Sequence, residues 1–105
     1  MGTAGDPTPF EAAAVLTLRA APELAGTEEA EQAFAPALAV PPGTPVVVDL
    51  SAVTFLTLEA VVPLLALVER CAAEGQALLI VASAYVRRKW ALLGLDPVIP
   101  LQPVG

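Results

Sequence analysis

Carboxyl and hydroxyl side chains gather in one stretch of the chain, where Asp49, Ser51, Thr54, Thr57 and Glu59 follow an apolar run. Functional groups of an open parallel sheet collect outside the carboxyl ends of its strands, so Asp49 could bind a metal ion or a phosphoryl group there. However, no second acid lies close to Asp49 in the sequence. Asp and Ser commonly bond their own backbone in turns, so we expect Asp49 and Ser51 to shape a turn.

Composition excludes several kinds of chemistry. The chain has no histidine, which removes the commonest general base and the commonest zinc ligand. It also lacks a glycine-rich phosphate loop and a cluster of metal ligands, so we expect no enzyme activity, no cofactor and no metal. The alternative is a small-ligand binder or an enzyme that uses Asp49. Cys71, the only cysteine, reads as a small buried hydrophobe.

Charge and targeting signals bear on partners and location. A net charge of −6 disfavours nucleic acid and anionic membrane surfaces, because both carry negative charge. A lone cysteine suits a reducing compartment, and the N-terminus does not resemble a signal peptide. We therefore expect a cytoplasmic protein of bacterial type.

Strand and helix patterns alternate along the chain. We expect a flexible tail at 1–9 and one domain at 10–105, with strands ending the segment 10–18 and at 46–50 and 77–82. The run 46–50 is continuously apolar up to Asp49, which suits a strand covered on both faces. A first helix is expected to begin with an N-cap at Thr27 and to be limited or kinked by Pro36. Two further helices are expected at 58–73, ending near Gly75, and at 85–93, ending at Gly94. A weak edge strand is expected at 98–101. This order predicts an α/β fold with a mostly parallel sheet of four to five strands, an antiparallel or edge N-terminal strand, and three to four helices.

The helix expected at 58–73 is apolar over an unusually wide arc. Its core-facing stripe should comprise Leu58, Val61, Leu65, Val68 and Ala72. A second set extends that stripe to one side: Ala60, Pro63, Leu64, Leu67 and Cys71. The surplus flank either binds a partner, a second copy of the chain included, or is covered by a neighbouring helix.

Three of the five basic residues stand together as Arg87, Arg88 and Lys89. Such a run could meet an acidic partner. The spacing of Val86, Trp90 and Leu93 favours the alternative, a solvated helix face with these three side chains turned inward.

The second half of the chain resembles the STAS family, whose members include anti-sigma factor antagonists. The resemblance rests on VVVDLSAVTFL (46–56), GQALLIVAS (75–83) and VRRKWALLGLDPVIPLQ (86–102). Members that act in sigma-factor switches carry Asp-Ser-Ser/Thr-Gly after the Phe-Leu step, and a kinase phosphorylates the first serine. Here the matching run is Thr57-Leu58-Glu59-Ala60, so Leu58 occupies the phosphoacceptor position without a hydroxyl.

The neighbours of Leu58 are weak substitutes for the lost serine. Thr57 is a weak candidate for a displaced phosphoacceptor. Threonine is also a favoured N-cap residue, and we prefer the interpretation that Thr57 caps the helix that follows it. Glu59 could supply a permanent negative charge, but a phosphate carries about −1.5 to −2, and a first-turn glutamate already favours the helix dipole.

The resemblance implies a non-enzymatic regulatory module that binds an anti-sigma factor or kinase-like ATPase without the serine switch. An accessory STAS subunit of an ABC-type transport complex is the alternative. Docking is expected through the loop 51–57 and the exposed flank of the following helix. The predicted partner-binding residues are Ser51, Thr54, Thr57, Leu58, Glu59, Ala60, Pro63 and Leu67.

Overall fold

Strands and helices alternate along the chain in the computed structural model, which describes residues 15–41 and 43–102. The expected tail at 1–9 and the start of the first expected strand, 10–14, lie outside the described residues. The strands are β1 (Leu16–Arg19), β2 (Glu23–Leu24), β3 (Val46–Leu50), β4 (Phe55–Leu56) and β5 (Leu78–Ala82). The helices are α1 (Thr27–Phe34), α2 (Pro36–Ala39), α3 (Leu58–Glu74) and α4 (Ala84–Leu93).

All strand pairs are parallel, as the alternation predicts. β3 lies between β1 and β5, with Val46 opposite both Leu16 and Leu78. β2 and β4 form a separate two-stranded ladder. The α/β class is thus confirmed, and β1 is an edge strand of the described sheet. The five strands divide between two sheets because β2 and β4 pair with each other beyond the carboxyl ends of β1 and β3.

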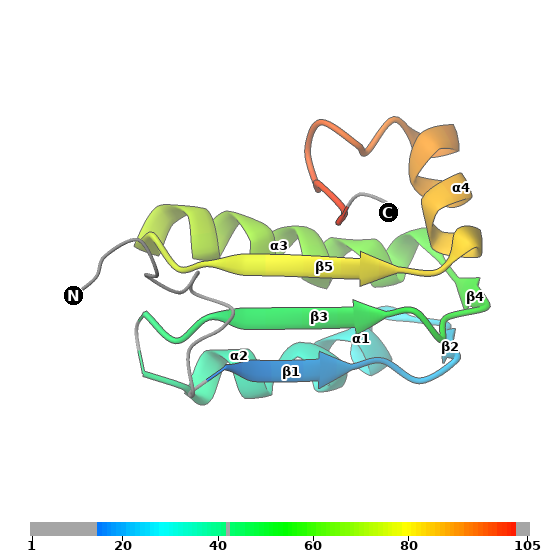
Figure 1. The fold of residues 1–105 in the computed structure, drawn as a ribbon. Coiled ribbons are helices and arrows are strands. Elements are labelled where there is room, and N and C mark those ends of the chain that lie inside the picture. The colour runs from blue at the N-terminus through cyan, green and yellow to red at the C-terminus, as the bar shows by residue number, and fades with distance from the viewer. Residues whose placement is uncertain (1–14, 42, 103–105) are drawn as a thin grey trace.

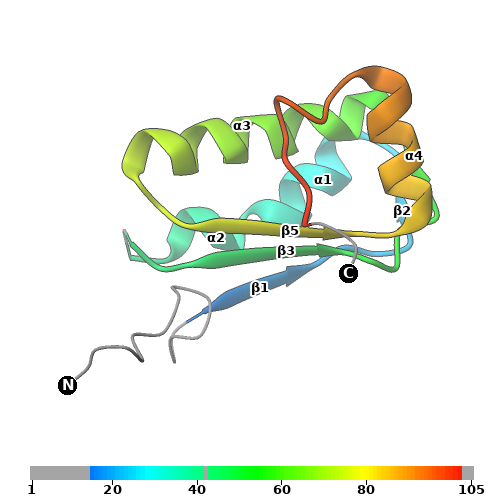
Figure 2. The ribbon, with the colours of Figure 1, turned by 45° about the horizontal axis from the view of Figure 1, so that its top comes forward.

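The helices α1, α2 and α3 lie on the same face of the three-stranded sheet (Figures 1 and 2). Side chains of β3 alternate accordingly: Val46, Val48 and Leu50 are buried, whereas Val47 and Asp49 are half-buried. Within the described residues no helix covers the opposite face of the sheet. The expectation that helices cover both faces of β3 is therefore wrong. The apolar run correctly indicated that β3 is buried, but it did not indicate how many of its faces are covered.

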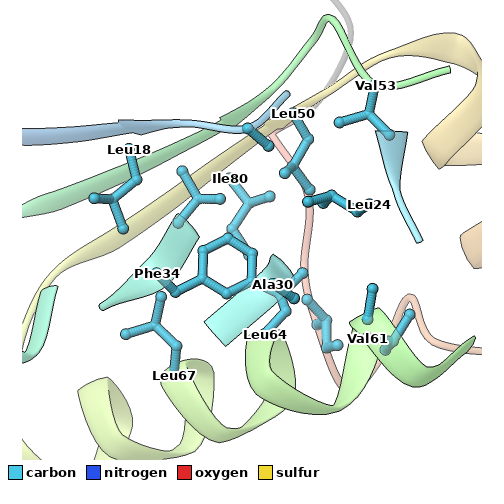
Figure 3. Packing of buried hydrophobic residues seen from close by; sticks show 14 of the residues in the cluster. Leu18, Leu24, Ala30, Phe34, Leu50, Val53, Val61, Leu64, Leu67 and Ile80 are labelled. Atoms are coloured by element: carbon cyan, nitrogen blue, oxygen red, sulfur yellow. The ribbon is translucent and has the colours of Figure 1, made fainter. Parts of the chain in front are cut away.

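The core fills the space between the sheet and the helices (Figure 3). The ring of Phe34, from α1, lies between Leu18 and Ile80 of the sheet and Leu64 and Leu67 of α3. Because α1 supplies this large side chain, it holds α3 at a fixed position over the strands. The aliphatic remainder of the core packs around it.

Helix ends follow the expected capping residues with one exception. Gly75 and Gly94 close α3 and α4 in the left-handed conformation, with φ of 66° and 69°. The break between α1 and α2 falls at Pro36, which stands at the first position of α2. The N-cap of α1 is Gly26 and not Thr27, whose hydroxyl bonds another helix instead.

The strand expected at 98–101 is absent from the described residues, where Val98 belongs to a turn, Ile99 to a bend, and Pro100 and Leu101 have no regular structure. Pro97 and Pro100 lack the N–H that a ladder requires, and Ile99 is turned fully into the core. Trp90 is completely buried, as expected, and its Nε1 donates to the Ile99 carbonyl at 3.0 Å. A single backbone bond, from Gln102 N to Ile80 O at 2.7 Å, joins this segment to β5.

Candidate partner-binding surface

The predicted site residues follow β3 at one end of the molecule, where β2, β4 and the start of α3 meet (Figure 1). The turn after β3 leads into β4, which pairs with β2 and delivers the chain to α3. The backbone N–H groups of Thr54 and Phe55 both donate to the carbonyl of Pro22, at 2.8 and 3.2 Å. The short β2–β4 ladder therefore fixes where α3 begins.

Asp49 and Ser51 form a turn, as their sequence predicts. Asp49 Oδ1 accepts from the Ser51 backbone N–H at 2.9 Å and from the Ser51 hydroxyl at 2.5 Å. These bonds, the hydroxyl bond first, hold the pKa of Asp49 below its usual range, and nearby Arg19, at 3.9 Å, adds to the effect. The carboxylate is thus occupied by its own turn.

Thr57 is the N-cap of α3, which confirms the preferred interpretation of this residue. Its side-chain oxygen accepts from the backbone N–H of Ala60 at 3.4 Å. Thr54 is exposed, and its hydroxyl donates to the carbonyl of Pro22 at 3.4 Å. Both threonine hydroxyls therefore have local structural partners.

Pro63 lies inside α3, five residues after its first residue, and cannot donate to the carbonyl of Glu59. The hydroxyl of Thr27, the first residue of α1, donates to that same carbonyl at 3.3 Å. A group that the proline leaves without its helical partner is thus satisfied from the neighbouring helix. This contact ties the beginnings of α1 and α3 together.

The face that α3 turns to the core differs from the expected one. Leu58 and Ala72, expected inside, are exposed, while Leu65 and Val68 are half-buried. Four of the buried residues come from the second set, which was expected to lie beside the stripe, and Val61 comes from the stripe itself. The buried residues of α3 are Ala60, Val61, Leu64, Leu67 and Cys71. The apolar arc of α3 allowed either rotation, and packing against α1 and the sheet selects this one.

This rotation leaves large apolar side chains in water at the start of α3. Leu58 and Val62 are each 61% exposed and lie one helical turn apart on the same face. Phe55, in β4, is 46% exposed. We call these three residues the α3 patch. Sequence reasoning had not selected Phe55 or Val62; the alternation of Phe55 with buried Leu56 was the available signal for Phe55.

A groove of about 410 Å³ runs beside the patch, between α3 and the α1–α2 segment. Glu31 and Arg70 are the charged members of its lining. The rest of the lining is apolar: Phe34, Ala35, Leu38, Pro63, Ala66 and Leu67. Ala66 stands one turn after Val62, so the groove continues the exposed apolar face of α3.

The predicted binding residues divide by accessibility. Ser51, Thr54, Leu58 and Glu59 are exposed, and Thr57 and Pro63 are half-exposed. Ala60, at 1% exposure, belongs to the core and is closed to a partner, and the buried Leu67 reaches only the groove lining.

Two further features of the described residues concern chemistry and membranes. No group of three or more His, Cys, Asp or Glu side chains within 15–41 and 43–102 could hold a metal ion. In the same residues no helix has the length and apolar character to cross a bilayer. Cys71 is a buried free thiol, and burial raises its pKa.

Comparison with known families agrees with this architecture. A family model described as "Mlab, STAS domain" matches residues 10–102, nearly the whole chain. The chain belongs to the STAS family. No curated protein and no solved structure matches it. The fold of this STAS domain is thus of the regulatory, anti-sigma antagonist-like kind, and the family is in general non-enzymatic.

Proposed function

We propose that this STAS domain is a non-enzymatic regulatory subunit that binds an ATPase-type protein partner through the α3 patch. The observation that carries the proposal is the exposure of Leu58 and Val62 side by side at the start of α3. Complete burial of a leucine or valine side chain contributes about 1.5–3 kcal/mol, so covering both supports a stable contact. The adjoining groove supplies further apolar surface to the same partner.

Binding through this patch has no phosphorylation switch at its centre. Leu58 has no hydroxyl, and the Thr57 hydroxyl caps α3. A phosphate at position 58 of a serine-bearing relative would add negative charge to the contact, whereas Leu58 is permanently apolar. The complex with an anti-sigma factor or kinase-like ATPase is therefore constitutive, in the reducing cytoplasm that suits the Cys71 thiol.

A second candidate is an accessory subunit of an ABC-type transport complex. Leu58 favours this candidate too, because a permanently assembled subunit needs no reversible switch. Both candidates use the same surface, so a single set of variants tests them.

The test measures affinity for purified kinase-type anti-sigma factors and ABC-type ATPases encoded beside the gene. Val62→Glu places a charge in the α3 patch, so we expect at least a tenfold loss of affinity for the true partner, about 1.4 kcal/mol or more. Ala73→Glu, a matched control, adds the same charge at an exposed position near the other end of α3 and should bind within about twofold of the wild type.

The class of protein that binds decides between the two candidates. Equal affinity of Val62→Glu and wild type, or no binding to either class, would contradict the proposal. A mass measurement after incubation with the kinase-type protein and ATP should show no added phosphate. Phosphate on Thr57 would overturn the constitutive mechanism.

A further inference from the structure

The helix α4 leaves two leucines in water on its outer side. Only Val86 and Trp90 of this helix are fully buried. Leu92 is 81% exposed, and Leu93, expected inside, is 41% exposed. The expectation of an inward Leu93 is wrong because Trp90 and Val86 already fill the space beneath α4, and Gly94 turns the chain away directly afterwards.

Two cations, Arg88 and Lys89, stand beside these leucines and form no ion pair with a described residue. In the described part of the chain the ion pairs are Arg19–Asp49 and Arg70–Glu74, and neither involves α4. The guanidinium of Arg87 donates to the Gln102 carbonyl, which leaves Arg88 and Lys89. Unpaired cations are unexpected in a chain with 11 acidic and five basic residues.

The cations and the leucines share one surface. Tyr85, Arg88, Lys89 and Leu92 recur at the three- and four-residue spacing of a single helix face. With Leu93 they line a cleft of about 290 Å³, and we call these five residues the α4 face. Lys89 Nζ lies 3.4 Å from the Tyr85 hydroxyl and 5.7 Å from the centre of its ring, which holds the ammonium at the edge of the cleft.

Tyr85 also joins this face to the end of the molecule that carries the α3 patch. Its hydroxyl accepts from the Leu56 backbone N–H at 3.2 Å, next to Phe55. The helix α4 lies beside β4 at this end (Figure 1). A protein bound at the α3 patch can therefore reach α4.

We propose that the α4 face binds an acidic protein segment, in which carboxylates pair with Arg88 and Lys89 and an apolar side chain enters the cleft beside Leu92. Charge complementarity supports this occupant, because among the described residues neither cation forms an ion pair, in a chain whose net charge is −6. A nucleic acid or an anionic bilayer would extend past these two cations and meet the rest of a chain whose net charge is −6, whereas a short acidic segment can stay on the α4 face. This inference rests on the proposed function in one respect: the proposed function names the protein to which the acidic segment belongs.

The test uses a display library of short random peptides selected on the full-length wild-type chain. Selected peptides should combine at least two Asp or Glu with a large apolar residue within about one helical turn. The most enriched peptide, titrated into labelled protein, should shift the amide resonances of Tyr85 to Leu93. Its affinity should fall at least tenfold in Arg88→Glu/Lys89→Glu.

Arg19→Glu/Arg70→Glu is the matched control, since it makes the same change in net charge away from α4 and should keep most of the affinity. Val62→Glu should bind the peptide as the wild type does, which separates this inference from the proposed function. Arg88→Ser/Lys89→Ser removes the cations without adding acids and should weaken binding less than the glutamate pair. The melting curves of all variants verify folding.

In the peptide experiment, three outcomes would overturn the inference: no enrichment, enriched peptides without acidic residues, or equal loss of affinity in the control pair. Co-sedimentation of the wild type, but not of Arg88→Glu/Lys89→Glu, with phosphatidylcholine–phosphatidylglycerol vesicles would assign the face to an anionic membrane instead. Absence of such co-sedimentation supports the protein segment.

Discussion

Single side chains at the end of β3 shape the local turn and the start of α3. The Ser51 hydroxyl and backbone N–H both donate to Asp49 Oδ1, and the Thr57 oxygen caps α3. The side chains of Asp49 and Thr57, which were candidates for binding or accepting a phosphoryl group, therefore form hydrogen bonds within a turn and a helix cap. The exposed apolar side chain of Leu58 is the distinctive surface feature beside them.

The lowered pKa of Asp49 makes the folded state sensitive to acid through this turn. In Ser51→Ala the hydroxyl bond is lost, so the Asp49 pKa should rise toward its usual value of about 3.9. A depressed carboxyl pKa stabilises the fold above the unfolded-state pKa, and the contribution is lost as the pH falls through the folded-state value. At neutral pH the free energy of unfolding of the wild type should therefore be about 1 kcal/mol larger than that of Ser51→Ala. This difference in free energy should shrink below about pH 4, where Asp49 becomes protonated.

Two measurements check this prediction. Carboxyl NMR titration gives the Asp49 pKa, and urea unfolding at neutral and acidic pH gives the free energy of unfolding. Ser51→Thr keeps the hydroxyl and serves as the control. An unchanged Asp49 pKa in Ser51→Ala would show that the hydroxyl bond is not the main cause.

At the level of elements, α1 and α3 are joined where α3 is weakest. Pro63 removes one hydrogen bond from α3, and Thr27 supplies a substitute donor to the Glu59 carbonyl. Phe34, at the other end of α1, packs between α3 and the sheet (Figure 3). The start of α3, and with it the α3 patch, is thus positioned by α1.

A double-mutant cycle tests this coupling between Thr27 and Pro63. Thr27→Val should lower the free energy of unfolding by about 0.5–1.5 kcal/mol in the wild type, because the Glu59 carbonyl loses its donor. In Pro63→Ala the restored backbone N–H can donate to that carbonyl, so the same change should cost less. Thr27→Ser, which keeps the donor, is the control. Equal costs of Thr27→Val in both backgrounds would contradict the coupling.

Considered whole, the molecule has one continuous core that reaches from the sheet to α4. The buried cluster includes residues of all three strands of the main sheet, of α1 and α3, and also Trp90 and Ile99. Because the last described segment shares this core, the carboxyl-terminal third should not unfold separately. One cooperative transition is the usual behaviour of domains of fewer than about 150 residues.

Trp90, the only tryptophan, provides a direct test of this cooperativity. Its fluorescence should shift to longer wavelength on unfolding, with the same urea midpoint as far-ultraviolet circular dichroism, which reports all helices. An earlier fluorescence transition would instead show that α4 and the segment after it detach from a folded remainder.

Much of the fold was predictable from local patterns in the sequence. The order of β1, β3 and β5 with the helices between and after them, the caps at Thr57, Gly75 and Gly94, and the buried Trp90 agree with the structure, whereas β2 and β4 were not expected and the strand at 98–101 is absent from the described residues. For the site, the turn at Asp49, the cap at Thr57 and the absence of a hydroxyl at Leu58 follow from the sequence in the same way. These features depend on neighbours within a few residues, so periodicity and capping preferences suffice to predict them.

Tertiary packing alone decided which surfaces remain open. The sequence showed that α3 is apolar over a wide arc, but only its contact with α1 determines that Leu58 and Val62 face water while Ala60 and Leu67 face the core. The β2–β4 ladder, the bond from Thr27 to Glu59 and the outward Leu93 likewise join or expose residues through elements distant in sequence. Burial depends on which elements pack together, whereas a local pattern records only that a side chain is suited to burial.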